Sequence, residues 1–323
     1  FNDSFVFSGA TNSRDLLLAL QFLTAKITDP GYRPEALRQA TKGIEQMFLG
    51  FAHTPNGPLA LEISNLLASG DPRFGTPPKD VLLSRTLEEV KAWLTPQLQK
   101  GPIEIGIVGD MDIEETITAV AQTLGALPTR DSTPNLDALL KVSFPSTPFT
   151  KTYTIDSQIP KGLAVFYWPT TDSLNVHVNR RLNIMASIFA DRLRLKLREE
   201  MGGTYSPSAR SMASDVFPGY GYMTSSIDID PTMSDKIVDA MKEIAGDMAT
   251  HGVTEDELER AKLPALTSVR ESARTNGYWL GNVVSRAQDK PEVLDWARSR
   301  ESDMASISKA DIDALTKAYL SPD

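Results

Sequence analysis

Residues 197–206, LREEMGGTYS, lie at the point where two sequence patterns meet. The preceding stretch, 174–200, repeats apolar residues every three or four positions, which is typical of one long amphipathic helix. The two following stretches, 204–212 and 219–229, alternate apolar and polar residues as the strands of an antiparallel pair do. The sequence therefore predicts a long helix that passes directly into two antiparallel strands.

The turn between these elements contains two glycines and is flanked by two polar side chains of interest. Gly202 and Gly203 allow the helix to end in a left-handed turn, which would aim Tyr205 from the start of the next strand. Arg198 lies seven residues before Tyr205. An arginine near a helix C-terminus stabilises the last carbonyls whatever its function, and a tyrosine is ordinary in a strand. Spacing alone leaves both a functional and a structural interpretation open.

The composition is close to the average for globular proteins, with 41% hydrophobic and 23% charged residues. A length of 323 residues suffices for about two domains. The net charge of −9 and the scattered basic residues argue against a nucleic-acid surface. No apolar run reaches the roughly 20 residues of a membrane span. Cysteine is absent, which excludes disulfides, thiolate metal sites and cysteine nucleophiles.

The rest of the chain alternates predicted helices with a few predicted strands. Residues 128–148 carry four prolines and little periodicity, so they are the best candidate for a linker. Strands are predicted at 103–110, 150–156 and 163–168. The remaining helices are predicted at 13–27, 34–51, 57–69, 86–98, 112–127, 232–249, 254–273, 277–288 and 308–320.

Two parts of the chain repeat each other. Residues 5–42 match 226–263 at a constant offset of 221, and 86–96 fall beside the segment 308–322, whose start lies at an offset of 222. In both copies a strand enters a helix, a glycine-containing turn follows, and a second helix begins. Chance similarity between amphipathic helices is the alternative explanation, because any two such helices share their spacing.

The repeat predicts an α+β fold of two related domains, each with a mainly antiparallel sheet packed against helices. Residues 1–135 form the first predicted domain. It has no counterpart of the strands and long helix that precede the repeat in the second copy, so we expect it to be truncated at its N-terminus. Residues 136–323 form the second predicted domain, which carries the segment with Arg198 and Tyr205.

The sequence offers no metal motif. His53, His177 and His251 lie far apart, and none belongs to an HExxH or HxxEH motif. Without thiols, a zinc site formed by this chain alone is not expected, so we predict no metal ligand and no cofactor-binding residue. The motifs GxSxG, GxxxxGK[ST] and GxGxxG are also absent. Asp110 and Asp112 could bind a cation, but acidic residues in this place favour the start of the helix that follows.

LREEMGGTYS, between a long helix and the strand GYGYMTSSIDI, resembles the C-terminal half of the pitrilysin/insulinase family of zinc peptidases, the inverzincins. Three further segments resemble the bacterial zinc-protease branch of that family, so the resemblance covers nearly the whole chain. These segments are FSGATNSRDLLLALQFLTAKITDPGYRPEAL, LASGDPRF and WLTPQLQKGPIEIGIVGD.

The resemblance implies a fold of two homologous halves that close around an unfolded peptide. In the family, zinc and the general-base glutamate belong to the N-terminal half, which carries HxxEH. An arginine and a tyrosine of the other half reach the substrate backbone, and these roles would pass to Arg198 and Tyr205 as catalytic residues. This chain lacks HxxEH. Its implied partners are therefore a zinc-bearing N-terminal half, of the same protein or of a partner subunit, and a peptide substrate, without nucleic acid or membrane.

Three functions follow as hypotheses. The first is the substrate-binding C-terminal half of a zinc metallopeptidase that cleaves peptides or unfolded proteins and is inactive without its zinc-bearing half. The second is a non-catalytic scaffold or assembly subunit of the same fold. The third is a binding module that holds extended peptides at exposed strand edges. Bacterial relatives of this branch are often exported, so the resemblance implies a periplasmic location, with the cytoplasm as the alternative.

Overall fold

The computed structural model describes residues 3–157, 161–201 and 207–321, without the side chains of 198–201. Its internal contacts divide the chain into two compact units. Unit 1 comprises Phe1–Phe48, Pro77–Leu136 and Thr275–Val293, and unit 2 comprises Leu49–Thr76, Asp137–Arg274 and Leu294–Asp323. The domain boundary predicted at residue 135 stays a prediction.

Unit 2 contains an antiparallel sheet of three strands in the order β1-β3-β2. The strands are β1 (Gly162–Pro169), β2 (Ser208–Ala213) and β3 (Gly221–Ile229). The register pairs Gly162 with Ile229 and Ser208 with Ser226. The predicted antiparallel pairing of the two stretches that follow the long helix is thereby confirmed. β3 is the central strand, and its alternate residues point to opposite faces of the sheet.

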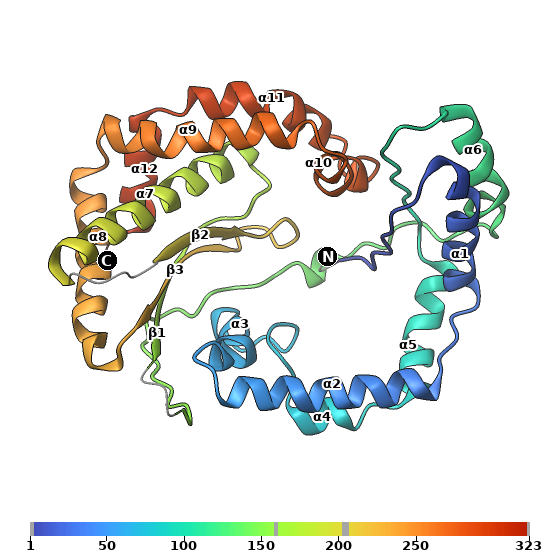
Figure 1. The fold of residues 1–323 in the computed structure, drawn as a ribbon, viewed down its shortest axis with the longest axis horizontal. Coiled ribbons are helices and arrows are strands. Elements are labelled where there is room, and N and C mark those ends of the chain that lie inside the picture. Colours follow the sequence, from blue (N-terminus) through green and yellow to red (C-terminus); the bar gives the residue numbers. More distant parts are fainter. Residues whose placement is uncertain (1–2, 158–160, 202–206, 322–323) are drawn as a thin grey trace. The chain divides into compact units, whose positions relative to one another are not determined.

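Helices of unit 2 cover one face of this sheet (Figure 1). Helix α7, which the sequence predicts at 174–200, contacts β2 and β3 on one side and α8, α9 and α12 on the other. The bounds are α7 (Val176–Met201), α8 (Ser234–His251), α9 (Glu255–Ser272), α11 (Val293–Ser306) and α12 (Lys309–Tyr319). A short helix, α3 (Ser64–Leu67), follows a π-helical segment, Leu59–Ile63, in the same unit.

The core of unit 2 is built around α7. Its apolar residues recur at three and four positions, so they form one stripe along the helix. Five of these side chains are at most 1% exposed: Leu182, Met185, Phe189, Leu193 and Leu197. Burying an apolar side chain of this size stabilises the fold by about 1.5–3 kcal/mol. The position of α7 is therefore fixed by its packing up to the turn that precedes Arg198.

Unit 1 is helical in its described part. The bounds are α1 (Leu16–Thr28), α2 (Pro34–Ala52), α4 (Lys79–Leu83), α5 (Leu87–Lys100), α6 (Ile113–Gln122) and α10 (Asn276–Asn282), of which α2 continues into unit 2. Its core consists of Leu20, Ile27, Leu98 and Leu124, against which Ile103, Ile105 and Ile107 pack.

The strands predicted at 103–110 and 150–156 are not present as strands in the structure. Ile103, Ile105 and Ile107 do show the alternation of a strand, because they point to the core of unit 1. Among the described residues of unit 1, however, no second strand pairs with them. A strand requires hydrogen bonds to a neighbour as well as the right residue pattern, and the pattern alone led to the wrong prediction.

The helices of the two units support the internal repeat. α2 begins at Pro34 and α9 at Glu255, which are 221 residues apart. Capping boxes open α5 at Thr86 and α12 at Ser308, which are 222 residues apart. Buried side chains follow the same offsets: Leu20 and Met241, Ile27 and Met248, and Leu98 and Leu320. Shared caps and shared buried positions are more than chance similarity between amphipathic helices requires.

The architecture as a whole is α+β, as predicted, with many helices and a small antiparallel sheet. Within the described residues, no helix is both long enough and apolar enough to cross a membrane.

Candidate functional site

The two residues predicted to act on a substrate lie at the end of α7 and just beyond it. The backbone of Arg198 belongs to the last turn of α7, which ends at Met201, and its side chain is outside the described part of the structure. Tyr205 lies wholly outside the described residues. Their roles stay predictions. The structure does describe the two elements that flank them, and these elements are held in place by specific contacts.

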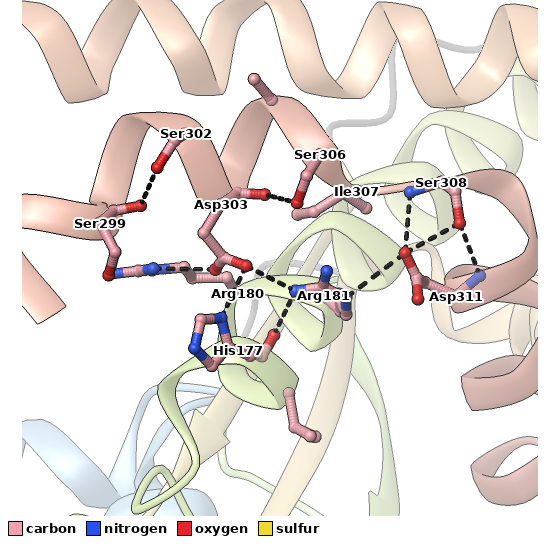
Figure 2. Close-up of polar contacts among 12 residues, drawn as sticks. His177, Arg180, Arg181, Ser299, Ser302, Asp303, Ser306, Ile307, Ser308 and Asp311 are labelled. Carbon is pink, nitrogen blue, oxygen red and sulfur yellow. Dashed lines mark hydrogen bonds and ion pairs between the residues drawn. The ribbon is translucent and has the colours of Figure 1, made fainter.

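The first half of α7 is anchored by a buried carboxylate, Asp303 of α11 (Figure 2). Asp303 Oδ2 accepts a hydrogen bond from Arg180 Nη1 at 2.8 Å, and Asp303 Oδ1 accepts one from Arg181 Nη1 at 3.1 Å. His177 Nδ1 lies 2.7 Å from the same Oδ1. Arg180 also donates to the carbonyl oxygen of Trp296 at 2.6 Å. One carboxylate thus binds three cationic or basic groups of α7.

Electrostatics favour the ionised form of Asp303. Its side chain is only 7% exposed, and such burial by itself opposes ionisation. Hydrogen bonds from the three α7 side chains outweigh the burial and lower the pKa of Asp303 below its usual value. This cluster is not apparent from the sequence. The spacing of His177, Arg180 and Arg181 within one turn was the available signal, but nothing in the sequence identified a partner more than 120 residues away.

Arg181 extends the same network to α12. Arg181 Nε lies 3.5 Å from Asp311 Oδ2, and Asp311 is the acidic member of the capping box that Ser308 begins (Figure 2). The hydrogen bonds from Ser308, chiefly from its backbone N–H, keep the pKa of Asp311 below its usual value. The N-terminal half of α7 is therefore tied to both α11 and α12.

The second half of α7 is anchored by Arg192, which lies six residues before Arg198. Its guanidinium forms a two-pronged pair with Glu257 of α9, with Nε–Oε1 at 2.6 Å and Nη2–Oε2 at 2.9 Å. It also donates to Asp247 Oδ2 at 2.7 Å and to the carbonyl oxygen of Gly252 at 2.9 Å. Such fork-shaped pairs fix orientation as well as distance. The last turns of α7 are thereby held against α8 and α9.

The pair of Arg192 and Glu257 makes stability depend on pH. Burial opposes ionisation of Glu257, but hydrogen bonds from Arg192 and Thr254 lower its pKa from 4.5 to about 2. A carboxyl with a depressed folded-state pKa adds stability that is complete above pH 4.5 and is lost as pH falls toward 2. We expect Glu257→Gln to lose roughly 2 kcal/mol at pH 7, and a smaller amount at pH 3.

Urea unfolding of the wild type and of Glu257→Gln, each at pH 7 and at pH 3, checks this expectation. Glu259→Gln serves as the control, because that side chain is 71% exposed and its ion pair with Lys262 is 3.7 Å long. Its stability should stay within about 0.5 kcal/mol of the wild type. If Glu257→Gln lost the same free energy of unfolding at both pH values, the lowered pKa of Glu257 would be contradicted.

The chain re-enters the described structure at β2, whose position is also fixed. Ala209 packs on the core of unit 2, and Ser208 Oγ lies 2.9 Å from Ser226 Oγ across the sheet. That contact locks the register of β2 against β3. The segment that contains Tyr205 therefore connects two elements that pack on one common core.

The three histidines lie in three different environments. His53 Nδ1 is 2.9 Å from the carbonyl oxygen of Asp156, His177 faces Asp303, and His251 Nδ1 is 2.8 Å from Asp247 Oδ1. Throughout the described ranges, no three His, Cys, Asp or Glu side chains converge as a metal site would require. The described residues thus offer no set of ligands for zinc, which the family resemblance places in the complementary half.

Asp112 has the structural role that its position in the sequence favours. Its side chain accepts a hydrogen bond from the backbone N–H of Glu115 at 2.9 Å and so caps α6. Asp110 also contributes to local structure, since its carbonyl oxygen accepts a hydrogen bond from Ser13 Oγ at 3.1 Å.

Comparisons with known proteins connect this arrangement to peptidases. A family model described as the peptidase M16 inactive domain matches residues 84–264. The chloroplastic stromal processing peptidase of Oryza sativa is 24% identical over 327 residues, covering 87% of this chain and 26% of that protein. The chain therefore spans about a quarter of the length of this curated relative.

Solved structures share the fold at low sequence identity. A protease from Helicobacter pylori has a TM-score of 0.77 at 12% identity, covering 96% of this chain and 74% of its own. A peptidase M16 inactive domain from Pseudomonas fluorescens has a TM-score of 0.71 at 15% identity, and the match covers 93% of this chain and 71% of that one. Both likenesses concern the fold of the chain.

Proposed function

Since the chain belongs to the peptidase M16 family as its inactive domain, we propose that it is the substrate-binding, C-terminal half of a zinc metallopeptidase. Its substrates would be peptides or unfolded proteins, and it would be inactive without a zinc-bearing half. The match of the family model over 84–264 carries the proposal, because that stretch includes α7 and the whole segment with Arg198 and Tyr205. The pitrilysin-family resemblance read from the sequence is confirmed by the same match.

Arg198 and Tyr205 would act on the peptide that is cleaved. Zinc held by the partner half would polarise the scissile carbonyl and activate a water molecule. Negative charge would then grow on the carbonyl oxygen. A phenol and a guanidinium can donate hydrogen bonds to that oxygen or to neighbouring peptide carbonyls, and fixed donors of this kind lower the barrier. The anchors on Asp303 and Glu257 support this role, because they hold the helix that carries Arg198.

Reconstitution tests the proposal. The chain is mixed with a half of the same family that carries HxxEH, and cleavage of an unfolded protein such as reduced, alkylated casein is followed. We expect no cleavage by either half alone, cleavage by the mixture, and loss of cleavage when zinc is chelated. If the two folded halves associate and the mixture still cleaves nothing, the proposal is wrong and the scaffold hypothesis replaces it.

We also propose a periplasmic location, on the ground of the resemblance to exported bacterial relatives. Fractionation of the producing cells tests it: the protein should be released with the periplasmic contents, and its recovery in the cytoplasmic fraction would contradict the proposal.

A further inference from the structure

One face of the sheet in unit 2 is covered by helices, and the opposite face is partly exposed. Ala164, Met223 and Ile227 point to the helices and are 9% exposed or less. The alternate residues of the three strands point the other way and keep part of their surface exposed. Six of these define the open sheet face: Tyr167, Arg210, Met212, Tyr222, Thr224 and Ser226.

Polar donors form one row across the open sheet face. The register places Arg210 of β2 opposite Thr224 of β3, and Thr224 opposite Tyr167 of β1. A guanidinium, a hydroxyl and a phenol therefore stand side by side, one on each strand. Burial raises the pKa of Tyr167 to about 12, so its phenol keeps its proton at neutral pH. The row can donate hydrogen bonds and carries one positive charge.

Apolar surface lies beside this row. Tyr222 packs edge-on against Tyr167, with ring centroids 5.6 Å apart, and against Phe144 at 6.4 Å, so only part of its ring is available. Met212 lies opposite Tyr222 in the register. Met212 is 49% exposed, which is high for a methionine on a sheet. A side chain that reached the open sheet face would therefore find an aromatic and thioether surface next to a cationic donor.

No carboxylate among the described side chains pairs with Arg210. It is the only basic residue in the three strands, and within the described structure it makes no hydrogen bond or ion pair. Arg180 and Arg192 of α7, in contrast, each bind a carboxylate. The one acidic residue of the strands, Asp228, lies four residues beyond Thr224, which is roughly 13 Å along the strand.

We propose that the open sheet face binds an extended stretch of the peptide substrate, and that Arg210 is a specificity-determining residue that pairs with an acidic side chain of that peptide. This inference rests on the proposed function. Arg210 follows Tyr205 by five residues, a span of at most about 17 Å. The acidic residue is therefore expected within about six residues of the bond that is cleaved. The surface of Met212 and Tyr222 favours an apolar neighbour beside it.

The test compares pairs of synthetic peptides cleaved by the reconstituted peptidase. The two members of each pair differ at a single position, which is Glu in one peptide and Gln in the other. From pair to pair, this position lies between two and six residues from the cleaved bond, on either side of it. We expect one position at which the Glu peptide has a kcat/KM about tenfold higher, mainly through a lower KM. The preference should weaken in 0.5 M salt, because salt screens an exposed ion pair.

Three variants assign the preference to one side chain. Arg210→Ala should reduce the Glu-to-Gln ratio from about ten to about one, and Arg210→Lys should keep an intermediate ratio, since lysine keeps the charge but loses the planar fork. Arg298→Ala is the control: Arg298 of α11 is 72% exposed and pairs with Asp295, away from the sheet. Its ratio should equal that of the wild type.

Two results would overturn the inference while leaving the proposed function intact. One is zinc-dependent cleavage of Glu and Gln peptides at equal rates at every position, and the other is a ratio that Arg210→Ala does not change. If the reconstituted protein cleaves none of the peptides and no unfolded protein, the proposed function fails and the inference falls with it. Arg210 is exposed, so its variants should unfold at the same urea concentration as the wild type.

Discussion

Replacing Tyr205 by phenylalanine is expected to lower zinc-dependent peptide cleavage by the reconstituted peptidase about 100- to 1000-fold. Phenylalanine keeps the ring and removes only the hydroxyl that would donate to the carbonyl oxygen of the substrate. Charge on that oxygen is greatest in the transition state, so the lost hydrogen bond should appear in kcat, with KM little changed. Steady-state kinetics with one peptide of defined cleavage site measure both parameters.

Tyr319→Phe is the matched control. Tyr319 closes α12 and packs on the core of unit 2, so it is part of the same unit but is not assigned to the substrate. Its kcat should stay within about twofold of the wild type. Normal cleavage by Tyr205→Phe would exclude a catalytic role for the phenol, while the assignment of the chain to its family would be unaffected.

Asp303→Ala is expected to destabilise the protein by about 3–5 kcal/mol. The carboxylate neutralises two arginines, and Arg180 is itself only 10% exposed. Without Asp303, the guanidinium of Arg180 would keep its charge in a poorly solvated place with no acidic partner among the contacts described above. Urea unfolding at pH 7, monitored by circular dichroism, gives the change in free energy of unfolding.

Two further variants make this result interpretable. Asp303→Asn retains the shape and one acceptor oxygen, so it should fold and lose less, roughly 2–3 kcal/mol. Asp295→Ala removes an equivalent carboxylate from the same helix, but one that is 80% exposed, and should change stability by about 0.5 kcal/mol or less. If Asp303→Ala is as stable as Asp295→Ala, the buried cluster does not anchor α7.

The elements that the sequence predicted well are those with a long, regular pattern. The stretch 174–200 was predicted as one helix and is observed as Val176–Met201, because its apolar stripe needs only the spacing along one helix. The helix predicted at 86–98 is observed as Leu87–Lys100, and the capping box that opens it, Thr86 with Glu89, lies within one turn. Local patterns of this kind carry their own structural information.

The errors and omissions concern contacts between distant residues. Residues 103–110 have the alternation of a strand, but their partner would have to come from elsewhere in the chain, and the described structure offers none. The cluster at Asp303 was missed for the same reason, since its carboxylate comes from a helix far along the chain from His177. Arg210 also carried no signal in the sequence, because its neighbours Thr224 and Tyr167 are defined by strand register.

By itself, the sequence determined the long helix, the paired strands after it, the repeated build of the chain, its family, and the pair of Arg198 and Tyr205 as candidates for substrate contact. These depend on the periodicity of side chains and on short segments in a fixed order. The tertiary structure alone decided which carboxylates hold α7 in place and which side chains share the open sheet face. Helix packing and strand register bring together groups that are far apart in the chain, and no local pattern specifies those pairings.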